Sequence, residues 1–178
     1  FSRKELHGAS LHRSTPLETL GQQITPPGLH YTLIHFEIPS ISFSATKDKW
    51  AITVCFNQQQ QTLSLSDMEK ALHASKCEFP VTLECAGNGR GHSLPRKPSV
   101  PWLFGGVSSA IWGGYPVSDL LRQVKMIDEK NHSQYHVIFQ GADSGIEFPN
   151  RSTSTPTHYR FALPLSFIFE NAVIIATT

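Results

Sequence analysis

The chain has 178 residues, about the length of one domain, and its content of 39% hydrophobic and 16% charged residues is typical of a globular protein. The formal net charge of +1 excludes the strong bulk attraction to nucleic acid or to anionic lipid that a basic protein has. No apolar run approaches the roughly 20 residues that a membrane-spanning helix needs. We therefore expect one globular domain with no membrane span and no nucleic-acid partner.

The first third of the chain is expected to be mostly extended. Residues 1–30 are polar and interrupted by prolines, which disfavour helix. Strands are predicted over residues 29–41 and 49–56, because apolar side chains alternate along the second of them. Residues 58–61, four glutamines, are expected to form a turn.

Two helices are predicted farther along. Residues 64–74 carry an apolar stripe, with Ser66 and Glu69 as a capping box at the start. A shorter helix follows Pro116, with Ser118 as its N-cap. Because strands outnumber helices and do not alternate regularly with them, the predicted class is α+β with β dominant. The remaining strands are predicted over residues 79–85, 135–141 and 172–178.

The three cysteines differ in their surroundings. No C-x-x-C pair is present, so a zinc or dithiol site is not indicated, and the odd number leaves at least one free thiol. Cys55 lies in a strand-like run and is expected in the core, whereas Cys77 lies in a polar stretch that suggests no role. Cys85 stands where a predicted strand opens into the glycine-rich stretch CAGNGRG.

Residue types alone leave several interpretations of residues 85–91. The glycine spacing does not fit the dinucleotide fingerprint, since prolines follow where a helix should begin. Cys85 is a candidate nucleophile if a histidine such as His92 serves as its base. It is also a candidate thiolate ligand of a soft or high-valent metal, with glycines allowing close approach of a cofactor and Arg90 holding an anion. A tight turn around a buried cysteine is the structural alternative.

Three sets of motifs occur in order along the chain. Residues 83–124 combine Cys-Ala-Gly-Asn, Pro-Trp, a Gly-Gly turn and a Trp-Gly-Gly segment followed by a Leu-Leu helix. Residues 17–41 contain Ile-Thr-Pro and then a histidine closing a predicted strand, and residues 136–145 contain a strand with Gly-x-Asp. Together they resemble the sulfite oxidase family of molybdopterin-dependent oxidoreductases, and more its bacterial-type branch, since the chain has no haem domain.

The resemblance implies a sulfite-oxidase-type molybdopterin-binding fold, incomplete at the C-terminus, with residues 1–178 forming part of that domain. It implies a molybdenum–molybdopterin cofactor with Cys85 as the protein's ligand to molybdenum and two sulfurs from the pterin. The chemistry would be two-electron oxygen-atom transfer. The family's His-Gly-x-Pro-x-Arg motif and dimerisation domain are expected to follow in a longer, homodimeric protein, and we expect the chain alone to retain the cofactor weakly.

The resemblance also implies roles for further residues, each matched to a family motif. Tyr31 and His35 lie on the strand expected to run along the cofactor, and Asp143 matches a cofactor-contacting aspartate. Arg90 matches an arginine that binds the substrate anion near the metal, and Trp102 matches an aromatic wall of the substrate pocket. We expect His35, Asp143 and Arg90 to converge on one cavity beside Cys85.

One departure from the family bears on the substrate. Sulfite-oxidising members carry Arg-Asn just before the strand histidine, where this chain has Leu33-Ile34. One anion-binding arginine is therefore missing, which argues against sulfite. The expected partners are a small anionic or sulfur-containing substrate and a separate electron carrier such as a cytochrome. The alternatives to this enzyme are a non-catalytic relic of the fold and an unrelated cysteine-nucleophile enzyme.

Overall fold

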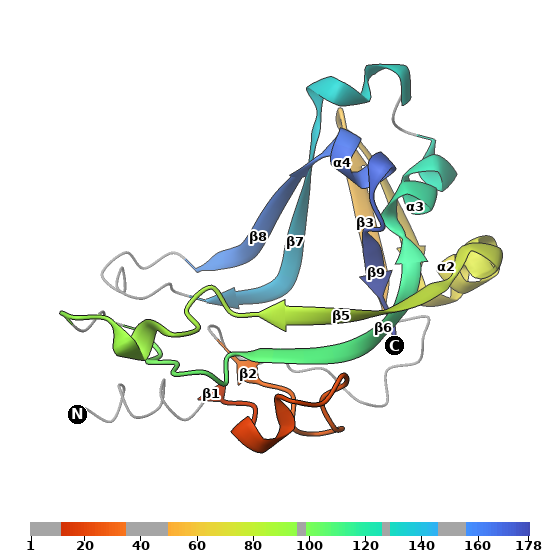
Figure 1. Cartoon of the computed structure of the whole chain (residues 1–178). Helices are drawn as coiled ribbons and strands as arrows, with labels where there is room; N and C mark the ends of the chain where they lie inside the picture. Colours follow the sequence, from red (N-terminus) through yellow and green to blue (C-terminus); the bar gives the residue numbers. More distant parts are fainter. Residues whose placement is uncertain (1–11, 35–49, 96–98, 126–128, 146–155) are drawn as a thin grey trace. The chain divides into compact units, whose positions relative to one another are not determined.

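Strands predominate over short helices in the computed structural model, which describes residues 12–34, 50–95, 99–125, 129–145 and 156–178 (Figure 1). The predicted β-dominant α+β class is thus confirmed. The strands are β1 His12–Arg13, β2 Thr32–Leu33, β3 Ala51–Phe56, β4 Gln59–Ser64, β5 Cys77–Glu84, β6 Val107–Pro116, β7 His136–Gly145, β8 Thr157–Pro164 and β9 Ile174–Ala176. The α-helices are α2 Leu65–Leu72, α3 Val117–Val124 and α4 Leu165–Glu170, and the 3₁₀ turns are η1 Leu17–Thr19, η3 His73–Ser75, η4 Arg90–His92 and η5 Glu129–Gln134.

The strands pair as three two-stranded ribbons, β1–β2, β3–β4 and β7–β8, and one three-stranded sheet in the order β5–β6–β9. The chain divides into two units, the first made of residues 1–38, 79–112 and 144–157 and the second of residues 39–78, 113–143 and 158–178. None of the helices in the described ranges combines the length and the apolar character that crossing a membrane requires.

Hydrogen bonds join the N-terminal segment of the first unit to Gly105, just before β6, and to Ser108 and Ser109 within β6. The Thr15 amide donates to the Gly105 carbonyl at 2.9 Å, and the hydroxyls of Thr15 and Ser108 lie 2.5 Å apart. The Tyr31 amide donates to the same Ser108 hydroxyl at 2.9 Å. Thr25 adds two more bonds, since its amide donates to the Ser109 carbonyl and its hydroxyl accepts from the Ser109 amide. Buried polar groups are therefore paired across long sequence separations here, which fixes the segments next to β1 and β2 against the start of β6.

The β3–β4 hairpin of the second unit is antiparallel, with Phe56 paired to Gln59. Its turn is Asn57–Gln58, where both residues have positive φ, the backbone of a tight two-residue hairpin loop. The predicted turn over residues 58–61 is therefore too late in the chain, since β4 already begins at Gln59. Cys55 is exposed on the outer face of β3, not in the core, because the alternation that turns Ile52, Val54 and Phe56 inward turns Cys55 outward.

The first predicted helix is confirmed as α2, but its cap is two residues earlier than expected. The hydroxyl of Ser64 accepts from the Asp67 amide at 3.0 Å, and the Asp67 carboxylate accepts from the Ser64 amide at 3.1 Å. This is a complete capping box. The prediction of Ser66 and Glu69 was wrong because the same Ser-x-x-acid spacing occurs twice in overlapping positions.

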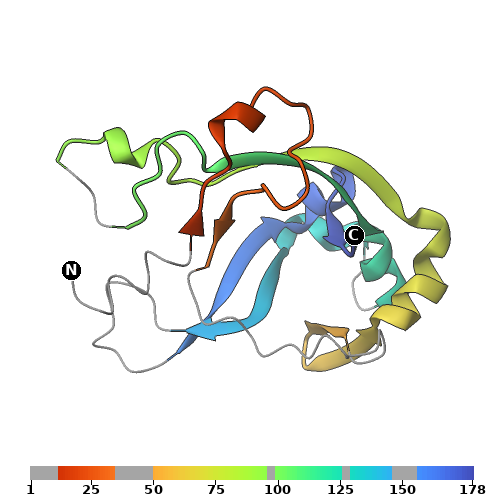
Figure 2. The same cartoon turned by 90° about the horizontal axis from the view of Figure 1, so that it is seen from below.

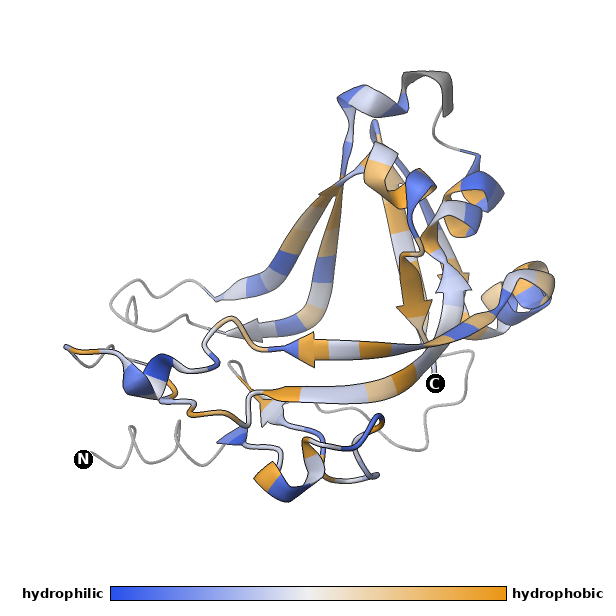
Figure 3. Ribbon diagram, viewed as in Figure 1, coloured by the Kyte–Doolittle hydropathy of each residue, from blue (hydrophilic) through white to orange (hydrophobic). Residues whose placement is uncertain are grey.

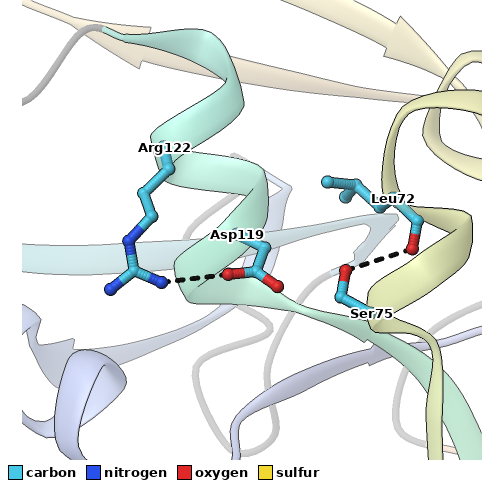
Figure 4. A network of polar contacts seen from close by, with 4 residues as sticks. All are labelled: Leu72, Ser75, Asp119 and Arg122. Atoms are coloured by element: carbon cyan, nitrogen blue, oxygen red, sulfur yellow. Dashed lines mark hydrogen bonds and ion pairs between the residues drawn. The ribbon is translucent and has the colours of Figure 1, made fainter.

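The second predicted helix is confirmed as α3, which begins at Val117 directly after β6. Pro116 occupies the N-cap position and no side chain caps the helix, so Ser118 is not its cap. On the helix surface Arg122 donates to Asp119 at 2.9 Å (Figure 4). The Ser75 hydroxyl, just after α2, donates to the Leu72 carbonyl at 3.1 Å (Figure 4).

Helix α3 packs into two hydrophobic clusters of the second unit. One face joins Leu63, Met68, Leu72, Tyr115, Leu120 and Val124, and the other joins Val117, Leu121, Leu165 and Ile168. Apolar residues at intervals of three and four on this short helix therefore anchor most of the buried side chains.

Several other elements differ from expectation. Strand β7 confirms the prediction over 135–141 and continues to Gly145, but β8 and α4 were not predicted. β7 and β8 lie side by side in both views, and polar and apolar segments alternate along them (Figures 2 and 3). The predicted strand 172–178 shrinks to β9. Of the predicted strand 29–41, residues 32–33 form β2, and residues 35–41 lie outside the described residues.

Candidate functional site

Cys85 is the first residue after strand β5. Its amide donates to the Gly106 carbonyl at 2.8 Å, which holds it beside the start of β6. Its thiol is free and partly buried. The strand end thus fixes the Cys85 backbone, as predicted, and the thiol remains available for chemistry.

The glycine-rich stretch after Cys85 forms a tight, hydrogen-bonded loop. The Asn88 amide donates to the Cys85 carbonyl at 2.8 Å, closing a turn. Gly89 has φ of 79°, a left-handed conformation that favours glycine, and its amide donates to the Leu103 carbonyl. The Gly91 amide donates to the Trp102 carbonyl at 2.8 Å. These bonds hold the loop of Cys85 against the Pro-Trp segment.

Asn88 is a positioning residue that was not among the predicted site residues. Its side-chain nitrogen donates to the Glu84 carboxylate at 2.9 Å, and its side-chain oxygen accepts from the Gly106 amide at 3.0 Å. The two bonds bracket Cys85, one to the last residue of β5 and one to the residue just before β6. The motif Cys-Ala-Gly-Asn was the available signal, because it contains the asparagine.

Arg90 folds back over the turn that contains Cys85. A β-carbon built on Gly87 would lie 2.6 Å from Nη2 and 2.7 Å from Cζ of Arg90, so the guanidinium occupies the space that a side chain at Gly87 would fill. Nη1 of Arg90 also donates to the Val100 carbonyl at 3.5 Å, a long contact that leaves most of its donors for other partners. The absent side chain of Gly87 thus places a cation above the turn.

Trp102 and Tyr31 line the same part of the first unit. Trp102 is 2% exposed, and its ring meets that of Tyr31 edge to face with centroids 5.9 Å apart. The pKa of the Tyr31 phenol is raised above its ordinary value, first by burial and second by the negative charge that Cys85 can carry. Tyr31 therefore lies close enough to Cys85 for the two groups to sense each other's charge.

Four ring nitrogens in the described part of the first unit are buried without a hydrogen-bond partner. The His30 ring bonds the Tyr31 carbonyl through Nδ1 at 2.9 Å, so that nitrogen carries the proton and Nε2 presents a lone pair. Buried polar atoms are rarely left unpaired in native proteins, and those that are point to a ligand, an ion or water. Neither His12 nor His30 was predicted as a site residue, since neither belongs to a motif. The atoms are His12 Nδ1, His30 Nε2, Trp102 Nε1 and Trp112 Nε1.

Two predicted site residues remain, Asp143 and His35. Asp143 belongs to the second unit, near the end of β7, where His158 Nδ1 donates to the carbonyls of Gly141 and Asp143 at 3.1 Å each. His35 lies outside the described residues. The convergence of His35, Asp143 and Arg90 on one cavity stays a prediction. His92 packs its ring against Phe104, with centroids 4.8 Å apart, which is not the Cys–His pair that a cysteine nucleophile needs.

The donor set around Cys85 suits a metal that brings most of its own ligands. Within the described ranges, His, Cys, Asp and Glu side chains form no group of three or more that could hold a metal ion. A single thiolate suits a soft or high-valent metal, and the turn after Cys85 is closely packed, with the Arg90 guanidinium in the space next to Gly87. The residues present therefore fit a cofactor-bound metal with Cys85 as the protein's ligand.

Comparisons with known proteins agree with this geometry. Residues 35–178 match the family described as oxidoreductase molybdopterin binding domain. The chain is 31% identical over 153 residues to nitrate reductase (NADPH) of Neurospora crassa, covering 79% of this chain and 15% of that protein. It is 32% identical over 132 residues to sulfite oxidase of Gallus gallus, covering 72% and 28% respectively. It is 30% identical over 145 residues to mitochondrial sulfite oxidase of Homo sapiens, covering 80% and 24%. The chain thus spans less than a third of the length of each of these relatives.

Proposed function

Because the chain belongs to the oxidoreductase molybdopterin-binding domain family, we propose that it forms part of an enzyme that exchanges an oxygen atom between molybdenum and a small oxyanion or sulfur compound. The cofactor supplies the two-electron oxygen-atom transfer when it is bound. The protein's contribution is to hold the metal through one thiolate, to orient the substrate and to stabilise its charge.

The observation that carries this proposal is the position of Cys85. Its thiol is free at the end of β5, its backbone is held by Gly106 and Asn88, and no histidine pairs with it as a base would among the residues that the structure describes. A rigidly placed thiolate that lacks a base is suited to binding a metal rather than to nucleophilic attack. Burial, and second the charge that Cys85 can carry, raise the pKa of the Tyr31 phenol, so Tyr31 would serve this site as a neutral hydrogen-bond donor.

Arg90 and Trp102 would bind the substrate. Arg90 supplies a permanent positive charge above the turn of Cys85, and its donors can bond an oxyanion in the charge-assisted manner. The buried indole N–H of Trp102 has no partner in the described residues. It can only donate a hydrogen bond, so it would offer the substrate a second donor. Both groups favour a substrate that carries acceptor oxygens and negative charge.

The substrate class follows from the relatives only in part. Relatives named nitrate reductase and sulfite oxidase match this chain at 31% and 32% identity, so nitrate is as well supported as sulfite. Leu33, in place of an arginine, weighs against sulfite. We propose an oxyanion that gives or accepts one oxygen atom, with a separate electron carrier, such as a cytochrome, that closes the redox cycle.

Because the chain alone is expected to retain the cofactor weakly, the test is to express the enzyme of which it is proposed to form part, in a host that makes molybdopterin, and to measure molybdenum and pterin per chain. We expect Cys85→Ser to lose most of the bound molybdenum, because an alcohol is a poor substitute for a soft thiolate. Cys55→Ser is the matched control, since Cys55 is a free thiol on the exposed face of β3 and should retain the metal. Equal molybdenum content in the two variants would contradict the assignment.

A further inference from the structure

His12 is a residue of the first unit to which the proposed function gives no role. It begins β1 and pairs with Leu33 of β2, so its cross-strand neighbour is apolar and supplies no hydrogen-bond partner. Its ring meets Trp102 edge to face, with centroids 5.5 Å apart and an interplanar angle of 75°. Its Nδ1 is buried and unpaired within the described structure.

Trp102 provides an independent observation at the same place. Its side chain is 2% exposed, yet Nε1 also has no partner in the described residues. An indole nitrogen is a donor only, and a histidine that carries its proton on Nδ1 is a donor there as well. Trp102 Nε1 is thus a buried donor, and His12 Nδ1 is a second one in the tautomer that carries its proton there; the described residues supply an acceptor to neither.

We propose that His12 is a further substrate-binding residue, whose Nδ1 acts together with Trp102 Nε1 to bind an oxygen of the oxyanion substrate. This proposal rests on the proposed function, because it assigns the acceptor at these two nitrogens to that site's substrate. Leu33 stands where sulfite-oxidising members of the family have an anion-binding arginine. His12 is the cross-strand neighbour of Leu33 and would supply a ring donor there.

The two rings are held by a rigid frame. Three residues after His12, the Thr15 amide bonds the Gly105 carbonyl, and the Thr15 hydroxyl bonds Ser108. A β-carbon built on Gly106 would lie only 3.2 Å from the Trp102 ring, so the glycine gives the ring room to lie there. Donors that are placed before the ligand arrives bind it with less loss of entropy.

The experiment follows the three indole N–H signals of the nitrogen-15-labelled, metal-free chain by NMR during titration with sodium sulfate and sodium nitrate. Sodium chloride at equal ionic strength is the reference. Trp50, which is 53% exposed, is the internal control, and Trp112 reports any general effect on buried indoles. We expect a saturable shift of the Trp102 signal with at least one of the two oxyanions.

His12→Phe keeps a ring against Trp102 and removes both nitrogens, so it should weaken oxyanion binding about tenfold or more. His12→Asn keeps a short hydrogen-bond donor and should lose less oxyanion affinity than His12→Phe. If His12→Phe fails to fold, as its amide spectrum would show, the same comparison is made between His12→Asn and His12→Leu. A Trp102 signal that neither oxyanion moves, or equal affinity in wild type and the His12 variants, overturns the proposal and leaves water as the partner of these nitrogens.

The failure of this inference is distinguishable from failure of the proposed function. The titration uses metal-free protein, whereas the metal assignment is tested by the molybdenum content of the Cys85 variant. Molybdenum retained through Cys85 together with a silent titration would overturn only the role of His12. A saturable titration with no molybdenum retained would support the oxyanion site and remove the metal assignment alone.

Discussion

The guanidinium of Arg90 lies over Gly87, in the space that any side chain at that position would need. A β-carbon on Gly87 would lie 2.6 Å from Nη2, 2.7 Å from Cζ and 3.0 Å from Nη1 of Arg90. The glycine of the Cys-Ala-Gly-Asn stretch and the arginine three residues later therefore act as one unit. The glycine, two residues after Cys85 in the chain, supplies the space, and the arginine fills it with positive charge.

Gly87→Ala should therefore displace Arg90 rather than unfold the loop. The atoms in the way are the flexible end of a side chain, so we expect the free energy of unfolding to change by no more than about 1 kcal/mol. Oxyanion affinity should fall about tenfold, as it should in Arg90→Ala, because a charge-assisted contact is lost. Gly21→Ala is the control, since no atom lies within 4 Å of a β-carbon there. Wild-type affinity in Gly87→Ala, measured by titration with nitrate, would contradict this account.

Tyr31 should make the folded protein less stable at alkaline pH. Its pKa is raised above 10.0 in the folded state by burial and then by Cys85, so the unfolded chain releases the phenol proton first as the pH rises. Between the ordinary and the raised pKa the folded state binds more protons, and its stability falls with increasing pH. Below the ordinary pKa both states are protonated, and this contribution to stability is fully present.

The measurement is the free energy of unfolding of the metal-free chain at about pH 9 and about pH 11, on either side of the ordinary pKa of a phenol. Tyr31→Phe should lose less stability over this interval than the wild type, and Cys85→Ser should fall between the two because it removes the second cause. Tyr159→Phe, at a side chain 59% exposed, serves as the control for the removal of one phenol. Equal losses in wild type and Tyr31→Phe would refute the prediction.

The candidate site was predictable where a motif and a strand end coincided. Cys85 and Arg90 were selected because the glycines around them signal close approach, and Trp102 because it follows a proline in a family motif; their roles stay predictions. His12 and His30 were not found, because the burial that leaves their nitrogens unpaired arises from contacts with residues far away in the sequence, Trp102 and Trp112. Such long-range packing leaves no local pattern.

The fold shows the same division between local and long-range information. Periodicity located β3, where apolar residues repeat at every second position, and α2 and α3, where they repeat at intervals of three and four. It missed β8 and α4, since short segments that begin or end at a proline have no clear period. The alternation along β3 already places Cys55 on the face opposite Ile52 and Val54, which pack against the core. The prediction that Cys55 lies in the core was wrong because it followed the residue type, which is usually buried, and not the position of Cys55 in the alternation.

Ser64→Ala should destabilise the second unit, because Ser64 and not Ser66 caps helix α2. The loss of an N-cap hydroxyl costs about 1 kcal/mol. The pKa of Asp67 is lowered by its hydrogen bonds with Ser64, so this stabilisation is present above the ordinary pKa of the carboxyl and is lost as the pH falls through the lowered value.

Chemical unfolding at about pH 7 and about pH 3, above and below the ordinary pKa of a carboxyl, should therefore show a smaller pH effect in Ser64→Ala than in the wild type. Ser66→Ala is the matched control and should behave as the wild type at both pH values. A larger effect in Ser66→Ala would restore the original prediction of the cap.

Gly114→Ala should separate strand β9 from β6. Gly114 pairs with Ala176 in this antiparallel pair, and a β-carbon there would collide with the Ile175 carbonyl oxygen and lie 2.9 Å from the Ala176 Cα. These are backbone atoms that cannot move aside without breaking the pairing. Ile175 also packs against both hydrophobic clusters of the second unit, so its displacement disturbs the core.

We expect Gly114→Ala to lower the free energy of unfolding by about 1–3 kcal/mol, the usual cost of overpacking. Gly141→Ala is the matched control, because the nearest atom to a β-carbon there is the carboxylate oxygen of Asp143, the end of a side chain that can rotate away. Urea unfolding gives both values, and the slope of the transition should be unchanged if both variants remain two-state. Amide hydrogen exchange of Thr177 and Thr178, which donate to the Gly113 carbonyl, should accelerate in Gly114→Ala alone. If the two variants unfold at the same urea concentration, the close approach of β9 to Gly114 is not what holds this end of the sheet.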